Sequence, residues 1–303
     1  TAKTITTTGY TLGGTGAGNY TLTQPTLAAN ITAKALTITG LTASSRVYDG
    51  TTSVSVSGSA ALSGIISPDV VAIAGSPSFA FDTKDVGTAK TIVTTGYTLT
   101  GADAADYTIS PTSLSANITA KALTVSGLTG TSRTYDGTTT ASATGSASLV
   151  GIVSPDVVTL TGTPAYSFDT RDIGTAKTIT TTGYTLGGTG AGNYTLTQPT
   201  LAANITAKAL TVSGLTGTSR TFDGTTTASA TGSASLVGIV SPDVVTIGGT
   251  PAYAFDTRDI GTAKTITTTG YTLGGTGAGN YTLTQPTLAA NITAKALTIT
   301  GLT

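Results

Sequence analysis

The residues best suited to chemistry in this chain are aspartates that recur in pairs. Asp169 and Asp172 enclose Thr170 and Arg171, and the same spacing returns elsewhere in the chain. Ca²⁺ takes about six to eight oxygen ligands, many of them from carboxylates. Two carboxylates interrupted by a cationic side chain make a poor start for such a site, so we favour an Asp–Arg surface pair in a turn. Calcium stays the alternative, with candidate ligands Asp82, Asp85, Asp169, Asp172, Asp256 and Asp259.

Catalysis is disfavoured by the residue types that the chain lacks. It contains no His and no Cys, and every acidic residue is Asp. A Ser or Thr nucleophile needs a base, which is usually His, and a glycosidase needs two carboxylates that face a sugar-binding cleft. Near-identical copies would also place the same active site several times in series. We therefore expect no enzyme, no catalytic residue and no cofactor other than calcium.

Two further motifs could carry covalent modification. Lys177, with its equivalents Lys90 and Lys264, lies inside an apparent strand, and Asn204 and Asp172 supply the partner types for a Lys crosslink. The alternative, which we favour, is an outward Lys that protects an edge strand. The acceptor pattern for N-linked sugar arises easily in a Thr-rich chain. It recurs at Asn19, Asn30, Asn117, Asn193, Asn204, Asn280 and Asn291.

The elements that position these residues recur with a fixed period. The tetrapeptide KALT begins at Lys34, Lys121, Lys208 and Lys295, which are 87 residues apart. This period suits a small β-domain better than a solenoid, whose units run about 20–50 residues. We expect a fragment of a longer protein, with independent domains in series. Its parts are 1–33, the C-terminal part of a repeat; 34–120, 121–207 and 208–294, three whole repeats; and 295–303, the first strand of the next.

Each repeat has the pattern of strands and turns. Val, Ile, Thr and Tyr suit a half-buried pleated surface, and they alternate, as Tyr184 and Leu186 do on either side of Thr185. Turn signals such as Asp136-Gly137 separate the alternating runs. We expect about seven or eight short strands in each repeat, the number found in an Ig-like β-sandwich.

The apolar positions change parity between consecutive repeats. Ala116 and Ile118 are even-numbered, whereas Leu123 and Val125 are odd-numbered. Side chains alternate faces along a strand, so the inward face changes at Lys121-Ala122, where no Gly-rich or Pro-rich linker stands. We expect the last strand of one repeat to run almost directly into the first strand of the next, which limits bending between domains.

An aromatic-Asp-Gly-Thr-Thr motif marks every whole repeat. Its Asp-Gly step is typical of a tight turn. We expect the aromatic ring to pack into the core or the domain junction, in preference to a role for the Asp as a ligand. The phenylalanine in one copy indicates that the ring matters more than its hydroxyl. The motif residues are Tyr48, Asp49, Gly50, Tyr135, Asp136, Gly137, Phe222, Asp223 and Gly224.

The charge and hydropathy patterns narrow the range of partners. The formal net charge is zero, which argues against nucleic acid because that partner demands a basic face. No apolar run approaches the roughly 20 residues that a membrane helix needs. We expect neither partner for this fragment.

The ordered set KALT, GLT, [YF]DGTT, SPDVV, D[IV]GTAKT, GYTL, NYTL and ANITAK resembles the YDG-type repeat. That repeat belongs with the mostly bacterial Ig-like (MBG) modules of large filamentous-haemagglutinin-like surface adhesins. The resemblance covers the whole chain. It implies an all-β chain of tandem Ig-like β-sandwich domains in an elongated rod, with a β-grasp-like repeat as the alternative. It also implies a secreted protein on the surface of a Gram-negative bacterium.

We therefore expect stalk repeats of a large secreted bacterial adhesin, which project an adhesive tip for attachment and biofilm formation. Two alternatives stay open: the repeats themselves bind matrix polysaccharide, or they self-associate into an extracellular filament. The expected partners are neighbouring repeats of the same chain, with exopolysaccharide or adhesins on other cells as further candidates.

Overall fold

The chain folds as strands joined by turns. The computed structural model describes residues 1–110 and 112–301, and within these ranges it contains strands and short 3-10 turns but no α-helix. Thr and Gly are poor in helix interiors, and the strong helix formers Glu and Met are absent from the sequence. In the same ranges, no helix is long and apolar enough to cross a membrane. The all-β class is confirmed, and nothing described supports the β-grasp-like alternative, whose sheet packs against a helix.

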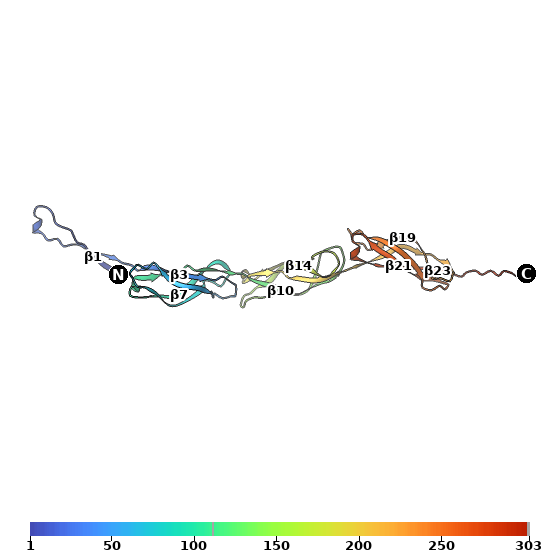
Figure 1. Ribbon diagram of the computed structural model, residues 1–303, viewed down its shortest axis with the longest axis horizontal. Coiled ribbons are helices and arrows are strands. Elements are labelled where there is room, and N and C mark those ends of the chain that lie inside the picture. Colours follow the sequence, from blue (N-terminus) through green and yellow to red (C-terminus); the bar gives the residue numbers. More distant parts are fainter. Residues whose placement is uncertain (111, 302–303) are drawn as a thin grey trace. The chain divides into compact units, whose positions relative to one another are not determined.

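The chain divides into two compact units. One unit comprises residues 1–122 together with 152–158 and 188–195; the other comprises 123–151, 159–187 and 196–303. The division does not fall at the repeat boundaries, because two loops of the repeat 121–207 belong to the unit that contains the preceding repeat. Figure 1 labels strands of both units.

The repeat 208–294 lies wholly in the second unit and forms two sheets. A three-stranded sheet has the order β19-β17-β22, and a four-stranded sheet has the order β18-β23-β21-β20. Strand β17 pairs antiparallel with β19 and parallel with β22. The strands are β17 (Lys208–Gly217), β18 (Arg220–Thr221), β19 (Ala230–Val237), β20 (Thr246–Phe255), β21 (Gly261–Gly274), β22 (Tyr281–Thr284) and β23 (Thr287–Thr293), with the 3-10 turn η4 (Ala278–Asn280).

The other repeats have the same order of elements. Repeat 34–120 contains β3 (Lys34–Ala43), β4 (Arg46–Val47), β5 (Val56–Ser63), β6 (Ala72–Phe81), β7 (Gly87–Thr100), η2 (Ala104–Asp106), β8 (Tyr107–Ile109) and β9 (Ser115–Thr119). Repeat 121–207 contains β10 (Lys121–Gly130), β11 (Arg133–Thr134), β12 (Ala143–Val150), β13 (Thr159–Phe168), β14 (Gly174–Gly187), η3 (Ala191–Asn193), β15 (Tyr194–Thr197) and β16 (Thr200–Thr206).

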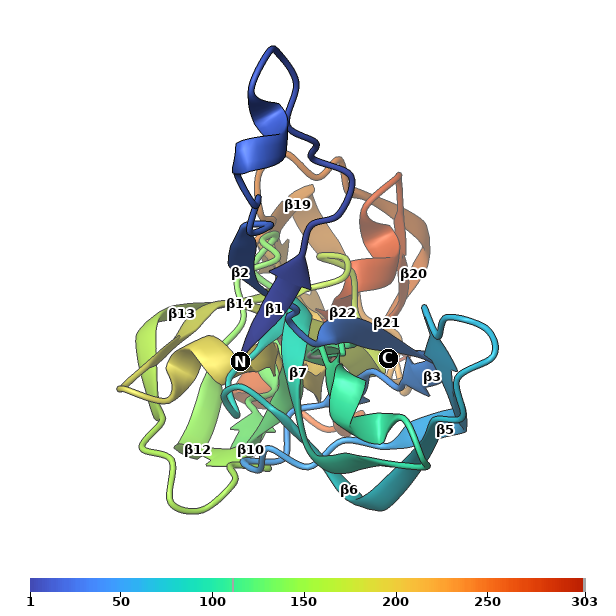
Figure 2. The same cartoon turned by 90° about the vertical axis from the view of Figure 1, so that its left-hand side faces the viewer.

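The first 33 residues form an antiparallel pair of strands. Strands β1 (Ala2–Thr6) and β2 (Thr26–Asn30) are joined by a segment that carries the 3-10 turn η1 (Ala17–Asn19). Figure 2 shows this turn in the segment that leaves and rejoins the two strands. These strands correspond to parts of β14 and β16 in the repeat 121–207.

One residue separates the last strand of a repeat from the first strand of the next. In the second unit, β16 ends at Thr206 and β17 begins at Lys208. Ala203 and Ile205 are buried in β16, whereas Leu210 is buried in β17. The buried positions therefore change parity at this point, and the inward face changes with them.

The two sheets of a repeat contribute to different apolar clusters. In repeat 208–294, Phe255, Ile266 and Ile292 of the four-stranded sheet form one cluster. Leu210 of the three-stranded sheet instead joins a cluster that contains Ile179 of the preceding repeat. The second unit therefore contains an apolar cluster that is shared by two consecutive repeats.

Candidate functional site: the junction between repeats

Four of the recurring motifs meet where two repeats join. In the second unit, the YDG turn and the loop between β13 and β14 come from repeat 121–207. The SPD loop between β19 and β20 and the η4 turn come from repeat 208–294. We call this set the second junction and define it by Tyr135, Arg171, Asp172, Ile173, Val240, Asp243, Asn280 and Tyr281.

Asp243 is the centre of the polar contacts of the second junction. Its side chain is fully buried, and its Oδ2 accepts hydrogen bonds of 2.7 Å from both Tyr135 and Tyr281. Its Oδ1 lies 2.8 Å from the guanidinium of Arg171. Tyr135 and Arg171 come from one repeat, whereas Asp243 and Tyr281 come from the next. A buried carboxylate is tolerated when it is paired and hydrogen-bonded, and here its partners link two repeats.

Burial alone would raise the pKa of Asp243. The hydrogen bonds from Tyr281 and Tyr135 and the charge of Arg171 outweigh that effect, so the pKa lies below its ordinary value. Burial, followed by the hydrogen bond to Asp243, raises the pKa of Tyr135 to about 12. At neutral pH the site therefore holds an ionised carboxylate against two neutral phenols.

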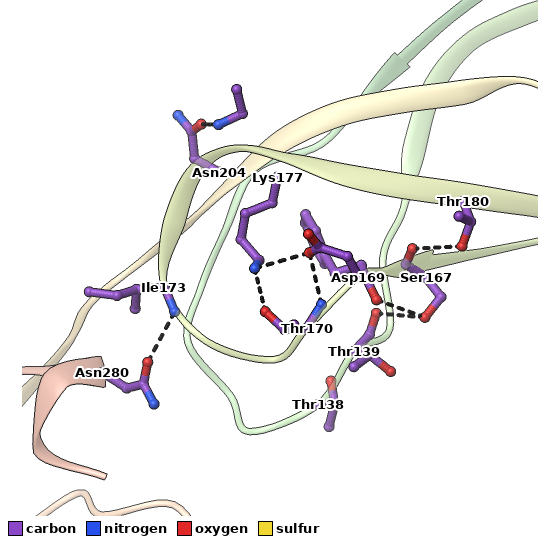
Figure 3. Close-up of polar contacts among 12 residues, drawn as sticks. Thr138, Thr139, Ser167, Asp169, Thr170, Ile173, Lys177, Thr180, Asn204 and Asn280 are labelled. Atoms are coloured by element: carbon purple, nitrogen blue, oxygen red, sulfur yellow. Dashed lines mark hydrogen bonds and ion pairs between the residues drawn. The ribbon is translucent and has the colours of Figure 1, made fainter. Parts of the chain in front are cut away.

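Asn280 makes a second polar link in the same junction. Its amide Nδ2 donates to Asp172 Oδ1 at 3.0 Å, and its Oδ1 accepts from the backbone N–H of Ile173 at 3.0 Å. Figure 3 shows the Asn280 amide directed at the Ile173 nitrogen from a different part of the chain. An asparagine suits this place because it donates and accepts at once, whereas a carboxylate would only accept.

The apolar part of the second junction is built around an aromatic pair. Tyr135 and Tyr281 meet edge to face with ring centroids 5.4 Å apart, a favourable geometry for aromatic rings. Tyr135 is 2% exposed and belongs to the shared apolar cluster, which also contains Val240 and Val245. The ring is therefore part of the core that joins the two repeats.

The first unit contains the same junction with one changed cation. Asp156 Oδ2 accepts from Tyr48 and Tyr194 at 2.7 Å each, and Lys84 Nζ lies 3.1 Å from its Oδ1. The hydrogen bonds from Tyr48 and Tyr194 lower the pKa of Asp156. Asn193 donates to Asp85 at 3.0 Å, as Asn280 does to Asp172. We call this set the first junction: Tyr48, Lys84, Asp85, Val86, Val153, Asp156, Asn193 and Tyr194.

The Asp and Gly of the YDG motif hold the turn that presents the tyrosine. Asp136 Oδ1 accepts from the backbone N–H of Thr138 at 2.9 Å and forms an ion pair with Arg133. Gly137 has a φ of 80°, a left-handed conformation that favours glycine. The equivalent Asp49 and Asp223 bond to Thr51 and Thr225 in the same way. These aspartates are therefore structural.

The glycine of the turn also contacts the following repeat, and two equivalent glycines separate the two effects. A Cβ at Gly137 would lie 2.7 Å from Val240 Cγ1, whereas one at Gly224, at φ 84°, would meet no atom within 4 Å. We expect Gly224→Ala to cost only the left-handed strain of about 1–2 kcal/mol. Gly137→Ala should cost about 1–3 kcal/mol more, because stiff Val240 must move. Chemical denaturation of both variants checks this, and equal losses would contradict the close contact.

The paired aspartates do not face a common site. Asp169 Oδ1 lies 3.0 Å from Lys177 Nζ, whereas Asp172 accepts from Asn280. Arg171 pairs with Asp243 of the next repeat. The favoured Asp–Arg surface pair within the turn is therefore wrong, because Arg171 pairs with a fully buried carboxylate of the next repeat instead.

Within residues 1–110 and 112–301, no group of three carboxylate, imidazole or thiol side chains is placed to hold a metal ion. The other candidates Asp82 and Asp256 pair with Lys90 and Lys264.

Lys177 does not protect a sheet edge. It lies in β14, which stands between β16 and β13, and its side chain is 11% exposed. Its ammonium donates to Thr170 Oγ1 at 2.6 Å, whereas Asn204 Oδ1 accepts from the backbone N–H of Ala176. Figure 3 shows the ammonium and the amide directed to these separate partners. The edge-strand interpretation is wrong, and the asparagine proposed for a crosslink has another role.

The N-x-[ST] asparagines fall into different environments. Asn193 and Asn280 are buried, with both amide atoms bonded across a junction. Glycosylation there would require the junction to open. Asn204 and Asn291 instead support the backbone of Ala176 and Ala263, which have positive φ values of 48° and 49°.

The buried carboxylates and phenols predict a broad pH optimum of stability. The pKa values of Asp156 and Asp243 are lowered, so their contribution is present above the unfolded value of about 3.9 and is lost as the pH falls through the folded values. The pKa values of Tyr135 and Tyr194 are raised to about 12. Their contribution is present below about 10 and is lost as the pH rises through about 12.

The chain has no His and no Cys, so no side chain has an ordinary pKa near neutrality. We expect the urea midpoint to be constant between about pH 5 and 9. It should fall as the pH drops below about 4 and as it rises above about 10. A series of urea titrations across this range checks the prediction. A change of midpoint between pH 5 and 9 would contradict it.

The sequence pattern did not single out Asp156, Asp243 or the binding role of Asn193 and Asn280. The available signal was repetition: SPDVV stands in every whole copy and NYTL in two of the three, and Asp156 and Asn193 come just before the alternating runs that contain Val158 and Tyr194. An invariant acidic residue beside a turn marks a contact that strand patterning does not explain.

The architecture and junction define a class of tandem-repeat β-proteins in which neighbouring copies are bonded through recurrent loop motifs. The YDG domain family matches the chain three times, over residues 32–114, 119–201 and 206–288. These matches span most of the chain, which therefore belongs to the YDG domain family. Among curated proteins and among solved structures, nothing matches this chain.

Proposed function

We propose that this chain is a length of structural stalk from a large secreted bacterial adhesin of the filamentous-haemagglutinin-like kind. Its repeats would act as Ig-like modules of an elongated rod that holds an adhesive tip away from the cell. The role is mechanical, without catalysis or cofactor. The tip, outside these repeats, would carry the chemistry of attachment and biofilm formation at the surface of a Gram-negative bacterium.

The buried junction is the observation that carries this proposal. Tyr135, Arg171 and Asp243 connect two repeats through charge-assisted contacts, which are among the stronger hydrogen bonds in proteins. Only Ala207 separates β16 from β17. A joint with no linker and a buried ionic contact resists bending, which is what a stalk requires.

The tyrosines of the two junctions favour spacing over sugar binding. Tyr48, Tyr135, Tyr194 and Tyr281 are buried, and Tyr166 and Tyr184 are bonded to each other through their hydroxyls at 2.9 Å. The four buried rings do not offer a stacking face to a saccharide.

The test is a solution study of the purified 303-residue chain. Sedimentation velocity and small-angle scattering should find an extended monomer, and titration with exopolysaccharide from the producing strain should show no binding. Polysaccharide binding would favour the matrix-binding alternative, and concentration-dependent polymers would favour the filament alternative. Either result would overturn the spacer role. Antibody labelling of intact cells tests the surface location independently.

A further inference from the structure

The sequence also repeats with a longer period, which spans three copies. Residues 1–42 are identical to residues 262–303, a shift of 261 residues or three 87-residue periods. Ile299 and Thr300 match Ile38 and Thr39 of the first whole copy, whereas the other two copies have Val and Ser at these positions. A copy of the Phe222 type is thus followed by the beginning of a copy of the 34–120 type.

This order brings together two faces that differ from those in the first and second junctions. One face belongs to repeat 208–294 and presents Phe222, Arg258 and Asp259, which are equivalent to Tyr135, Arg171 and Asp172. The other belongs to repeat 34–120 and presents Asp69, Asp106 and Tyr107, which are equivalent to Asp243, Asn280 and Tyr281.

The face of repeat 34–120 retains the form needed to receive an aromatic ring. Tyr107 donates to Asp69 Oδ2 at 2.6 Å, as Tyr281 does to Asp243. A cavity of about 610 Å³ opens beside Asp69, Tyr107 and Ile66. Ile66 is the equivalent of Val240, which packs with Tyr135 in the second junction. The cavity therefore lies where the preceding copy would place its aromatic side chain.

We propose that a copy of the Phe222 type docks on the face of a 34–120-type copy that follows it, and that this third junction is the weak joint of the array. The two complete junctions identify what covers this face, because in both of them the same loops of the preceding repeat cover it. The strength of one joint in three does not depend on what the stalk carries.

Two substitutions weaken the third junction. Phe222 lacks the hydroxyl that Tyr135 donates to Asp243. Asp106 replaces the asparagine whose amide donates to Asp172 at 3.0 Å, so the third junction sets the Asp106 carboxylate against that of Asp259. Like charges at this separation repel, whereas the asparagine would bond.

The other charges of this face do not offset the repulsion. Asp103 stands where the other copies have Gly190 and Gly277, and it adds a further carboxylate that accepts from the Val70 N–H at 2.7 Å. Lys3 and Lys34 also border the cavity, but their equivalents are present in every whole copy. In the third junction Arg258 would pair with Asp69, as Arg171 pairs with Asp243, and so would not neutralise Asp106.

The third junction can be recreated in the full chain by Tyr135→Phe with Asn280→Asp. The probe is hydrogen exchange of the Ile173 amide, whose N–H donates to Asn280 Oδ1 across the junction. We expect exchange at least roughly tenfold faster than in the parent chain, because the lost hydrogen bond and the repulsion both open the junction more often. Adding Asp172→Asn should slow the exchange part of the way back to the parent rate, since it removes the opposing carboxylate and supplies an amide donor, while the hydroxyl lost in Tyr135→Phe stays missing.

Asn204→Asp is the matched control, because Asn204 accepts from the backbone N–H of Ala176 and a carboxylate accepts equally well. It should leave the Ile173 exchange unchanged. The proposal is overturned if the double variant exchanges like the parent chain, or if adding Asp172→Asn does not slow the exchange of the double variant. Should circular dichroism show that the double variant is unfolded, Tyr48→Phe with Asn193→Asp, read at the Val86 amide and rescued by Asp85→Asn, decides the question at the first junction.

Discussion

Replacing Asp243 with alanine should lower the free energy of unfolding by about 3–5 kcal/mol, because it removes the shared acceptor of two buried phenols and one partner of an ion pair. The substitution leaves the hydroxyls of Tyr135 and Tyr281 and the guanidinium of Arg171 without their shared acceptor. Chemical denaturation, followed by far-ultraviolet circular dichroism, measures the loss.

Asp256→Ala is the matched control in the same repeat. Asp256 pairs with Lys264 at 3.0 Å, but half of the Asp256 side chain is exposed, so water screens its charge. The Lys264 ammonium keeps its hydrogen bond to Thr257 Oγ1 when the aspartate is lost. Its loss should be far smaller than that of Asp243→Ala. Equal losses in the two variants would show that the junction carboxylate has no special weight.

Removing Arg171 in the Asp243→Ala background shows how much of the stability loss comes from the unpaired arginine and how much from the two phenols. Arg171 is 37% exposed, so water can solvate its charge after the carboxylate is lost. The larger part of the penalty should therefore come from the buried phenols. A double variant close in stability to Asp243→Ala alone would support this division, since coupled partners do not lose stability additively.

The all-β fold could be predicted because it depends on local patterns. Alternating side chains predict the strands, and the parity change predicts the turn of the inward face between Ile205 and Leu210. Both signals lie within a few residues of each other along the chain. Strand periodicity therefore suffices for the elements and for the position of the boundary between repeats.

The junction could not be predicted in the same way, because its partners lie far apart in sequence. Tyr135 and Asp243 are separated by 108 residues, as are Asp172 and Asn280. The local pattern predicts that the arginine of the DTRD loop pairs with an aspartate of the same loop, whereas Arg171 pairs with Asp243 of the next repeat. Each motif alone has the pattern of a surface turn, and only the fold shows that the turns of consecutive repeats meet.

The sequence repeat does not coincide with a complete apolar core, because one cluster is shared by two repeats. The cluster around Tyr135 takes residues from both the four-stranded sheet of one repeat and the three-stranded sheet of the next. A single repeat excised at its sequence boundaries would lose part of that cluster and expose the rest of it to water. The joint therefore contributes to the stability of the array.

Tyr135→Ala should therefore destabilise the chain by about 3–5 kcal/mol, the cost of truncating a large core side chain. The ring is 2% exposed, meets Tyr281 edge to face and packs in a cluster that two repeats share. Truncation leaves a cavity in that cluster and also removes one of the two phenols that bond Asp243. Urea denaturation measures the total loss.

Tyr135→Phe separates the ring from the hydroxyl. It keeps the packing and removes only a hydrogen bond to a charged group, which contributes about 1.5–3 kcal/mol, so its loss should be smaller than that of Tyr135→Ala. The phenylalanine at position 222 shows that the turn accepts the ring alone. Tyr20→Ala serves as the control, because Tyr20 is 76% exposed and its removal should leave the urea midpoint unchanged. If Tyr135→Ala matched Tyr20→Ala, the shared cluster would not hold the two repeats together, and the stiffness proposed for the stalk would need another source.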